Sequence, residues 1–527
     1  MAAIVTDQFR IQNANNFVES IDNPANSYYV FLGLPNPAPA TVGFGRSGAD
    51  LAGYNSNIPD PRDTINNINH TSDTMMFGKK VNSANIRRLI KKRIWKTGTT
   101  YEMYRHDYGV DSTSPLTQSA RLYDANYYVM NKDYNVYLCI DNGSSGINTT
   151  GNASKDEPVF TDVEPSKAGE SGDGYIWKYL FSVPPSDIIK FDSTDYISVP
   201  NSWLTTDTAQ IKAVRDNGDS TNNNNQIKKV YIDKQGSGYS VNQSGLEVNI
   251  LGDGTGGKVV IDTDSLGKIT NAVVSSGGQG YTYGMVDLGT INAGVSTANA
   301  AKLIPIIPPS RGHGYDIYSE LGTDKVLIYS RFDDTTKDFP VDAKFAQIGI
   351  VKNPTQAGSA ATFIEPQYSS LSGIKFSSVT GTLPTPGTIV RQTVAGGTAQ
   401  GYAASYDEET MVLKYFQDRS LYFNSTSDDQ QDYVGVSTNS KINAFNSSAS
   451  DPITTTLGFS GVVDTAFTES KVTTTGNKVI DLATSFTIGL SSPEINKGSG
   501  DNLYLDNRPL IARNSRQKED IKIILEF

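Results

Sequence analysis

Hydrophobic residues in this chain fall mostly into short runs that end at glycine, proline, asparagine or aspartate, a pattern typical of β-strands. Residues 325–332 and 345–351 are clear examples, and both are short enough for the strands of a β-sandwich. Residues 125–130 and 134–141 form another pair of predicted strands, and the intervening residues 131–133 predict a hairpin-like turn. The chain is therefore expected to be mainly β.

The end of the chain predicts one more strand. Its hydrophobic residues alternate with polar ones and would share one face, namely Ile521, Ile523, Leu525 and Phe527. Because this face would be buried, removal of the strand is expected to damage the core.

One helix is predicted over residues 83–95, with Ser83 as its N-terminal cap. Hydrophobic residues recur there at helical spacing, at Ile86, Leu89, Ile90 and Ile94. The rest of the segment is basic, and the candidate partner-docking face consists of Arg87, Arg88, Lys91 and Lys92. Such a face is typical of a solvated amphipathic helix or of a surface that docks an acidic partner. DNA binding is the third alternative and the least expected, because the chain as a whole is acidic.

Two segments repeat a β run that turns at Gly-x-Gly-Tyr, one over residues 230–239 and one over 273–281. Glycine suits turns with positive φ, and the tyrosine that follows, Tyr239 or Tyr281, is expected to cover the turn against its sheet. The repeat predicts two copies of one β unit.

Composition divides the chain into a core and two inserted segments. The 527 residues suffice for roughly three or four domains. The predicted core comprises residues 1–204, 306–364 and 486–527, with all three tryptophans in the first part. Residues 205–305 form the Gly/Tyr-repeat β domain, and residues 365–485 predict a small β-barrel with a loop-rich tail.

Charge and cysteine content exclude several classes of protein. Acidic residues number 56 and basic residues 45, which gives a net charge of −11 and argues against a dedicated nucleic-acid-binding protein. The single cysteine, Cys139, excludes a disulfide framework within the chain and is expected to be a buried apolar residue. No segment approaches the roughly 20 apolar residues that span a bilayer, so no membrane partner is expected.

Catalytic and metal-binding motifs are missing, so no catalytic, metal or cofactor-binding residue is predicted. The three histidines, His70, His106 and His313, lack the spacing of zinc ligands. Residues 252–257 fit G-x-G-x-x-G but precede a predicted strand, not the helix that a dinucleotide site requires.

Acidic clusters leave two alternatives open. Asp262 and Asp264 begin like a calcium loop, but turn carboxylates are the commoner explanation. Residues 407–409 and 428–429 would have to supply any paired carboxylates of a glycosidase, and both clusters fall in predicted turns.

Ordered motifs resemble the baseplate wedge subunit of T-even-like contractile-tailed phages, the smaller, dimeric wedge protein. The motifs lie, in order, at residues 4–10 with 16–21, 29–33 and 44–47, at 172–185 with 196–200, more weakly at 345–354, and at 504–511 before the terminal strand. The family-motif residues singled out are Gly172, Asp173, Gly174, Tyr175, Trp177, Tyr179, Phe181, Pro184, Pro185, Asn507, Arg508 and Pro509.

These motifs also make physical sense without the family. Alternation places Trp177, Tyr179 and Phe181 on one face of a strand. Glycines before the strand allow a tight backbone approach, and prolines after it end the hydrogen-bonded ladder. Arg508 can fork onto a carboxylate, and Pro509 fixes the backbone, so a structural clamp is expected there.

The resemblance implies a mainly β fold with some α (α+β), in which a β-sandwich core carries smaller α/β parts. It also implies a non-enzymatic structural component of the virion tail baseplate, assembled in the host bacterial cytoplasm. The implied partners are a second copy of the chain, other wedge proteins and peripheral fibre-attachment proteins. The assembly would link hub and fibres and transmit the baseplate rearrangement before sheath contraction.

The runner-up interpretation is a carbohydrate-binding tail-fibre or receptor-recognition protein, suggested by the tyrosines and the Asn/Ser/Thr-rich loops. A tailspike-type glycosidase is a weaker third, because no motif nominates its carboxylate pair.

Overall fold

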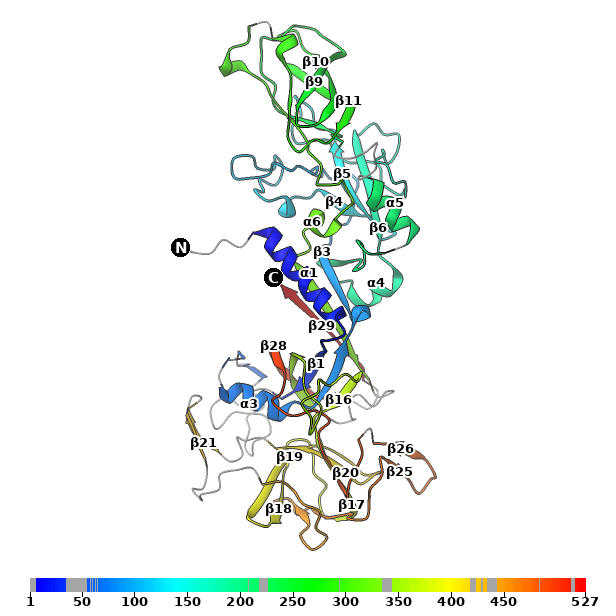
Figure 1. Cartoon of the computed structure of the whole chain (residues 1–527), viewed down its shortest axis with the longest axis vertical. Coiled ribbons are helices and arrows are strands. Elements are labelled where there is room, and N and C mark those ends of the chain that lie inside the picture. The colour runs from blue at the N-terminus through cyan, green and yellow to red at the C-terminus, as the bar shows by residue number, and fades with distance from the viewer. Residues whose placement is uncertain are drawn as a thin grey trace. The chain divides into compact units, whose positions relative to one another are not determined.

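The structure is a computed structural model of the chain (Figure 1). It describes residues 6–34, 55–56, 58, 60–61, 63, 65–206, 208–217, 226–292, 294–333, 344–417, 423–427, 430–433, 443–482, 484–512 and 517–527.

The chain forms two compact units, each assembled from separate stretches of sequence. Unit 1 contains Met1–Val18, Arg87–Leu327 and Ile524–Phe527. Unit 2 contains Glu19–Ile86 and Ile328–Ile523. Both units are built mostly of β-strands, so the prediction of a mainly β protein is confirmed.

The centre of unit 1 is a three-stranded antiparallel sheet of β4 (Tyr128–Met130), β5 (Asn135–Asn142) and β6 (Tyr175–Ser182). The hairpin between β4 and β5 confirms the predicted turn, although β4 is shorter than the predicted strand. Asn131 organises this turn, because its Oδ1 accepts hydrogen bonds from the backbone N–H groups of Asp133 and Asn135, both at 2.9 Å.

The helix predicted over residues 83–95 is wrong. Only η1 (Ser83–Asn85) is helical there, and it is followed by β3 (Ile86–Lys91), which pairs with β7 (Tyr196–Val199). The helical spacing was misleading because β3 is buried on both faces, so that Leu89 and Ile90 are adjacent in sequence and both enclosed. Pairing with β7 decides the structure of this segment over its local periodicity.

The Gly/Tyr segment contains a four-stranded sheet in the order β11-β10-β9-β12 and a two-stranded sheet of β8 and β13 (Figure 1). The strands are β8 (Val230–Lys234), β9 (Leu246–Gly252), β10 (Thr255–Thr263), β11 (Ile269–Gln279), β12 (Gly284–Val286) and β13 (Lys302–Pro305). Both repeat tyrosines are buried and accept backbone N–H groups at their hydroxyls, Tyr239 from Ala301 at 2.8 Å and Tyr281 from Gly257 at 3.0 Å. Tyr281 covers its glycine turn as predicted, because a Cβ added at Gly278 would lie 2.7 Å from its ring.

Unit 2 contains a five-stranded antiparallel sheet in the order β16-β2-β1-β15-β28. Its strands are β1 (Tyr28–Gly33), β2 (Phe77–Val81), β15 (Lys344–Lys352), β16 (Gln367–Ser369) and β28 (Asp501–Ala512), and α3 (Ile65–Thr74) precedes β2. The central strand β1 is buried throughout, and β15 confirms the strand predicted at residues 345–351.

A barrel is built from described strands between residues 372 and 491. Its sheet runs in the order β20-β19-β18-β23-β24-β17-β27, and pairing of β20 with β17 closes it. The strands are β17 (Ser372–Thr380), β18 (Ile389–Val394), β19 (Gly397–Asp407), β20 (Val412–Phe416), β23 (Ile453–Thr454), β24 (Ser460–Val463) and β27 (Leu490–Ser491). Two hairpins accompany it, β21 (Phe423–Ser427) with β22 (Gln430–Tyr433) and β25 (Lys471–Thr473) with β26 (Val479–Asp481).

Two strands remain to be described, β14 (Lys325–Phe332) and β29 (Glu519–Glu526). They confirm the strands predicted at residues 325–332 and at the C-terminus. They belong to a sheet in the order β29-β14-β3-β7. The remaining elements are helices, namely α1 (Asp7–Asp22), α4 (Pro185–Phe191), α5 (Ala209–Asn217), α6 (Ile317–Leu321), η2 (Leu122–Asp124), η3 (Gly289–Ile291) and η4 (Thr297–Asn299). In the described part of the chain, none of the helices has the length and apolar content needed to cross a membrane.

Candidate functional site

The motif at residues 172–185 begins with a tight turn that needs glycine. Gly172 and Gly174 have φ angles of 71° and 86°, in the left-handed region. At Gly174, an added Cβ would lie 2.9 Å from the Cα of Gly143, so the two backbones touch there. Between the glycines, the Asp173 carboxylate accepts the backbone N–H groups of Tyr175 at 3.0 Å and Lys155 at 2.8 Å.

The Tyr175 side chain extends these contacts into the core of unit 1, so that Asp173, Tyr175 and Asn152 form a hydrogen-bonded clasp. Its hydroxyl accepts the backbone N–H of Tyr101 at 2.8 Å and donates to the carbonyl of Asn152 at 2.7 Å. The Asn152 side chain in turn donates to the carbonyl of Asp173 at 2.8 Å. Three segments distant in sequence are therefore held together by motif residues, and each hydrogen bond satisfies a group that would otherwise be buried unpaired.

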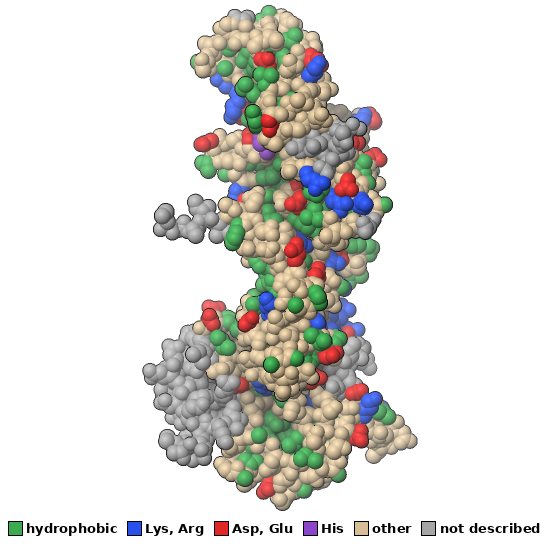
Figure 2. Space-filling model, in the orientation of Figure 1, with side chains coloured by type: hydrophobic (Ala, Val, Ile, Leu, Met, Phe, Trp, Pro, Cys, Tyr) green, Lys and Arg blue, Asp and Glu red, His purple; other side chains and the backbone are tan. Residues whose placement is uncertain are grey.

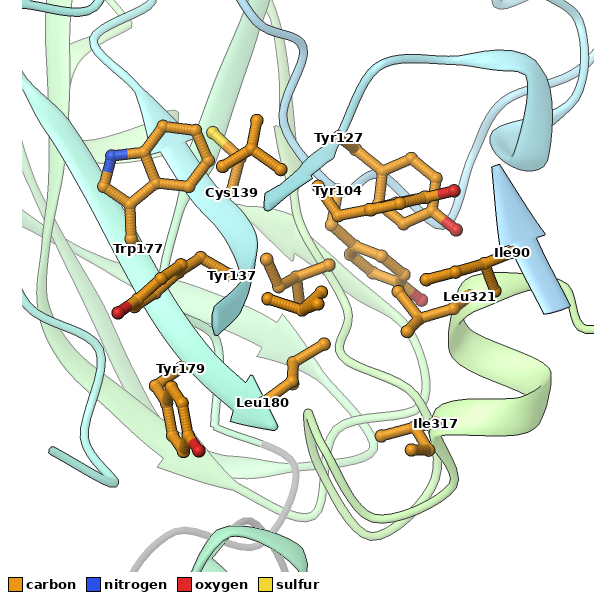
Figure 3. Packing of buried hydrophobic residues seen from close by; sticks show 14 of the residues in the cluster. Ile90, Tyr104, Tyr127, Tyr137, Cys139, Trp177, Tyr179, Leu180, Ile317 and Leu321 are labelled. Atoms are coloured by element: carbon orange, nitrogen blue, oxygen red, sulfur yellow. The ribbon is translucent and has the colours of Figure 1, made fainter. Parts of the chain in front are cut away.

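Beyond the turn, β6 carries the predicted aromatic face. Trp177, Tyr179 and Phe181 are all buried, and Figure 3 shows Trp177 and Tyr179 on one side of the strand. Trp177 stacks on Tyr175, with ring centroids 5.2 Å apart and planes 13° from parallel. The opposite side is buried too, because Leu180 faces Ile317 and Leu321 of α6 (Figure 3).

The two prolines end the strand and also begin a helix that the sequence did not predict. Pro184 is the N-cap residue of α4 and Pro185 is its first residue, where the missing N–H has no cost. A helix start after Pro-Pro is a recognisable signal, but α4 is only 7 residues long and shows little periodicity.

We expect Gly174→Ala to destabilise unit 1 by about 1–3 kcal/mol, because a side chain at this φ is strained and would collide with Gly143. Chemical denaturation with hydrogen exchange at β5 and β6 would measure the loss. Gly172→Ala is the matched control, because an added Cβ at this positive-φ position meets no atom within 4 Å. Equal losses in both variants would show that the approach to Gly143 contributes nothing.

The second part of the family motif lies in β28, an edge strand. Arg508 contacts Asp506 in the same strand, with Nε 2.5 Å from Oδ2, so the predicted pairing with a carboxylate is present. Asn507 is buried and accepts a hydrogen bond from Gln347 of β15 at 2.9 Å. Pro509 falls where the pairing with β15 shifts register, a position that tolerates proline because the ladder is interrupted there.

The basic residues of the predicted docking face do not share one helix face, because they lie on and just after β3. Three of them contact polar side chains of unit 1. Arg87 lies 2.7 Å from Asp187, Arg88 lies 2.6 Å from Asn15, and Lys92 lies 2.7 Å from Asp192. Lys91 has an exposed side chain, with Nζ 3.4 Å from Asp124. On the face drawn in Figure 2, Lys and Arg atoms form small groups beside Asp and Glu atoms.

The remaining sequence candidates are mostly structural. Cys139 is buried, and burial raises the pKa of its thiol well above the usual value. Asp264 caps its own turn by accepting the N–H groups of Leu266 and Lys268. Asp407 ends β19 and residues 408–409 lie in the turn that follows, whereas residues 428–429 lie outside the described residues. In the described ranges no cluster of three or more His, Cys, Asp or Glu could hold a metal ion.

The histidines occupy separate environments. His70 is buried in α3, and His106 accepts the N–H of Ile307 at Nδ1 over 3.1 Å. His313 is buried with Nδ1 2.6 Å from Oε1 of Glu320. This last pair lies beside an enclosed lysine, Lys178 of β6, a grouping that no spacing in the sequence reveals.

Two comparisons with known proteins match the region around this site. The family model described as Phage-Gp8 (Bacteriophage T4, Gp8) matches residues 157–234, which include the whole of β6 and both prolines. The baseplate wedge protein gp8 of Enterobacteria phage T4 is 26% identical over 218 residues, which cover 38% of this chain and 60% of that protein. The matched part thus spans about 60% of that relative. Both findings confirm the resemblance indicated by the sequence motifs: in this region the chain is similar to the phage baseplate wedge protein gp8.

Proposed function

We propose that this chain is a structural subunit of a phage tail baseplate wedge, located in the virion and assembled in the host bacterial cytoplasm. The observation that carries the proposal is the family match over residues 157–234, which includes the whole of β6. The motif residues there bind backbone groups and fill the core of unit 1, which is the role expected of residues that preserve a scaffold. The proposal gives the protein no substrate.

The proposed mechanism is assembly. A homodimer of the chain binds other wedge proteins and peripheral fibre-attachment proteins, links them to the central hub, and transmits the baseplate rearrangement that precedes sheath contraction. Rigid units that shift at weaker interfaces are a common basis for such transmission. Of the predicted docking residues, Lys91 is the best placed to contact a partner, because its side chain is 54% exposed. Charge reversal at Arg87, Arg88 or Lys92 would break contacts within unit 1 and would not test docking.

We also propose the finer architecture that the relationship implies, a β-sandwich core with smaller α/β parts and two inserted segments at residues 205–305 and 365–485. Separate hydrophobic clusters support the two insertions. One cluster draws on residues 227–307 and the other on residues 374–490. Each segment thus has the internal packing expected of a domain.

Labelling of the chain with a specific antibody in intact particles, followed by electron microscopy, tests the location. Label at the baseplate is the expected result. Label at distal fibre tips would overturn the wedge proposal in favour of receptor recognition.

Sedimentation velocity of the purified chain tests the dimer. An obligate dimer interface buries roughly 2,000 Å² or more in total, so the dimer should persist at micromolar concentration. A stable monomer at that concentration would contradict dimerisation but would leave the baseplate location intact.

A further inference from the structure

A hollow in unit 1 that opens to solvent is lined by a buried lysine whose ammonium group has few hydrogen-bond acceptors. Lys178, Lys228, His313, Glu164 and Pro308 are among its lining residues. Lys178 is only 2% exposed, although it lies in the middle of β6. Burial of an ammonium group is unfavourable unless its N–H donors find acceptors.

Lys178 has one such acceptor among the described residues, the carbonyl of Val163 at 2.9 Å from Nζ. Two of its three N–H donors therefore have no acceptor among the residues that the structure describes. Desolvation accordingly lowers the pKa of Lys178 to about 8.

The nearest buried carboxylate is occupied elsewhere. Both oxygens of Glu320 accept hydrogen-bond contacts, Oε1 from His313 Nδ1 at 2.6 Å and Oε2 from the backbone N–H of Gly314 at 2.7 Å. Gly314 has a φ of 87°, and an added Cβ there would lie 3.2 Å from Cε of Lys178. The absence of a side chain at Gly314 thus leaves space for the lysine stem beside His313.

A second cation borders the hollow. The Lys228 side chain is 31% exposed, and its Nζ lies 2.9 Å from Oε1 of Gln226 and 3.9 Å from Glu164, whose side chain is 51% exposed. Glu164 lines the hollow together with Lys178, Lys228 and the imidazole of His313, and its side chain is the most exposed of the four. Two ammonium groups and an imidazole form a set that hydrogen-bonds an oxyanion well.

We propose that this hollow binds a small oxyanion, a carboxylate or a phosphate, which accepts hydrogen bonds from Lys178 and Lys228. The anion supplies the acceptors that Lys178 lacks among the described residues. This site is independent of the baseplate proposal, because it depends only on groups inside unit 1.

Isothermal titration calorimetry of the full chain with sodium phosphate and, separately, sodium acetate, at constant ionic strength set by sodium chloride, tests the proposal. Binding of either salt is expected, and the comparison of the two identifies the preferred anion. Lys178→Met should weaken the affinity at least tenfold. Lys414→Met is the matched control, because Lys414 is a lysine of unit 2 whose pKa burial also lowers to about 8, and its loss should leave the affinity unchanged.

Two further measurements keep the test decisive if Lys178→Met fails to fold. Lys228→Met alters a more exposed side chain and should weaken binding about threefold to tenfold. Affinity should also fall as the pH rises above about 8, because Lys178 then loses the proton with which it binds the anion. The charged groups that act on Lys178 there are Glu320, Glu164 and Lys228. No heat of binding from either salt, or equal affinity in all variants, would mean that water alone fills the hollow and would overturn the proposal.

Discussion

Trp177→Ala is expected to destabilise unit 1 by about 3–5 kcal/mol, a large part of the stability of an ordinary domain. The indole is completely buried, stacks on Tyr175 and meets Tyr101 edge-on at 5.8 Å. Its removal leaves a cavity that the surrounding strands can close only in part. Hydrogen exchange of β5 and β6 as a function of urea concentration would measure the change in unfolding free energy.

Trp177→Phe separates ring packing from hydrogen bonding. The indole Nε1 is buried and has no hydrogen-bond partner among the described residues, so phenylalanine loses no hydrogen bond and keeps a ring beside Tyr175. Its cost should be well below that of alanine. Tyr283→Ala is the surface control, because Tyr283 is 64% exposed and should change stability by at most about 0.5 kcal/mol. A Trp177→Ala chain as stable as the control would contradict the role assigned to the motif.

Removal of residues 519–527 is expected to prevent recovery of a soluble, cooperatively folding chain. The deletion removes β29, in which Ile521 and Ile523 are 7% and 5% exposed and alternate with exposed residues. It also deprives β14 of a neighbouring strand and so exposes its backbone groups and apolar side chains. Soluble yield and calorimetric unfolding would measure the effect.

Point variants in the same strand test whether burial is the cause. Ile523→Ala should cost about 2–5 kcal/mol, whereas Lys522→Ala, on the exposed side, should cost at most about 0.5 kcal/mol. Similar losses from both variants would show that the strand acts through its backbone and not through its buried face.

The sequence predicted strands well where burial alternates or where a hairpin signal is local. β29 and the β4–β5 hairpin are examples, because each depends on neighbours close in sequence or on a clear period of two. β3 was mistaken for a helix because its partner, β7, is about a hundred residues away and because side chains on both of its faces are buried. No local pattern carries that information.

The motif strand was predicted from its residues, but its contacts were not. The aromatic face of β6 followed from alternation, whereas the clasp between Asp173, Tyr175 and Asn152 depends on how distant loops meet. The hollow at Lys178 is a stronger case. A lysine between two aromatic residues of a strand indicates a solvent-facing side chain, and only the arrangement of His313 and Glu320 reveals that it is enclosed.

Closure of the barrel in unit 2 has a consequence for aggregation. β20 is hydrogen-bonded to β19 on one side and to β17 on the other, so its backbone offers no template for strand addition by another copy of the chain. An unpaired strand edge invites such runaway polymerisation, and the pairing of β20 with β17 removes one. A contact made at β20 must then use outward side chains and neighbouring loops, and those positions are free to diverge without putting the fold at risk.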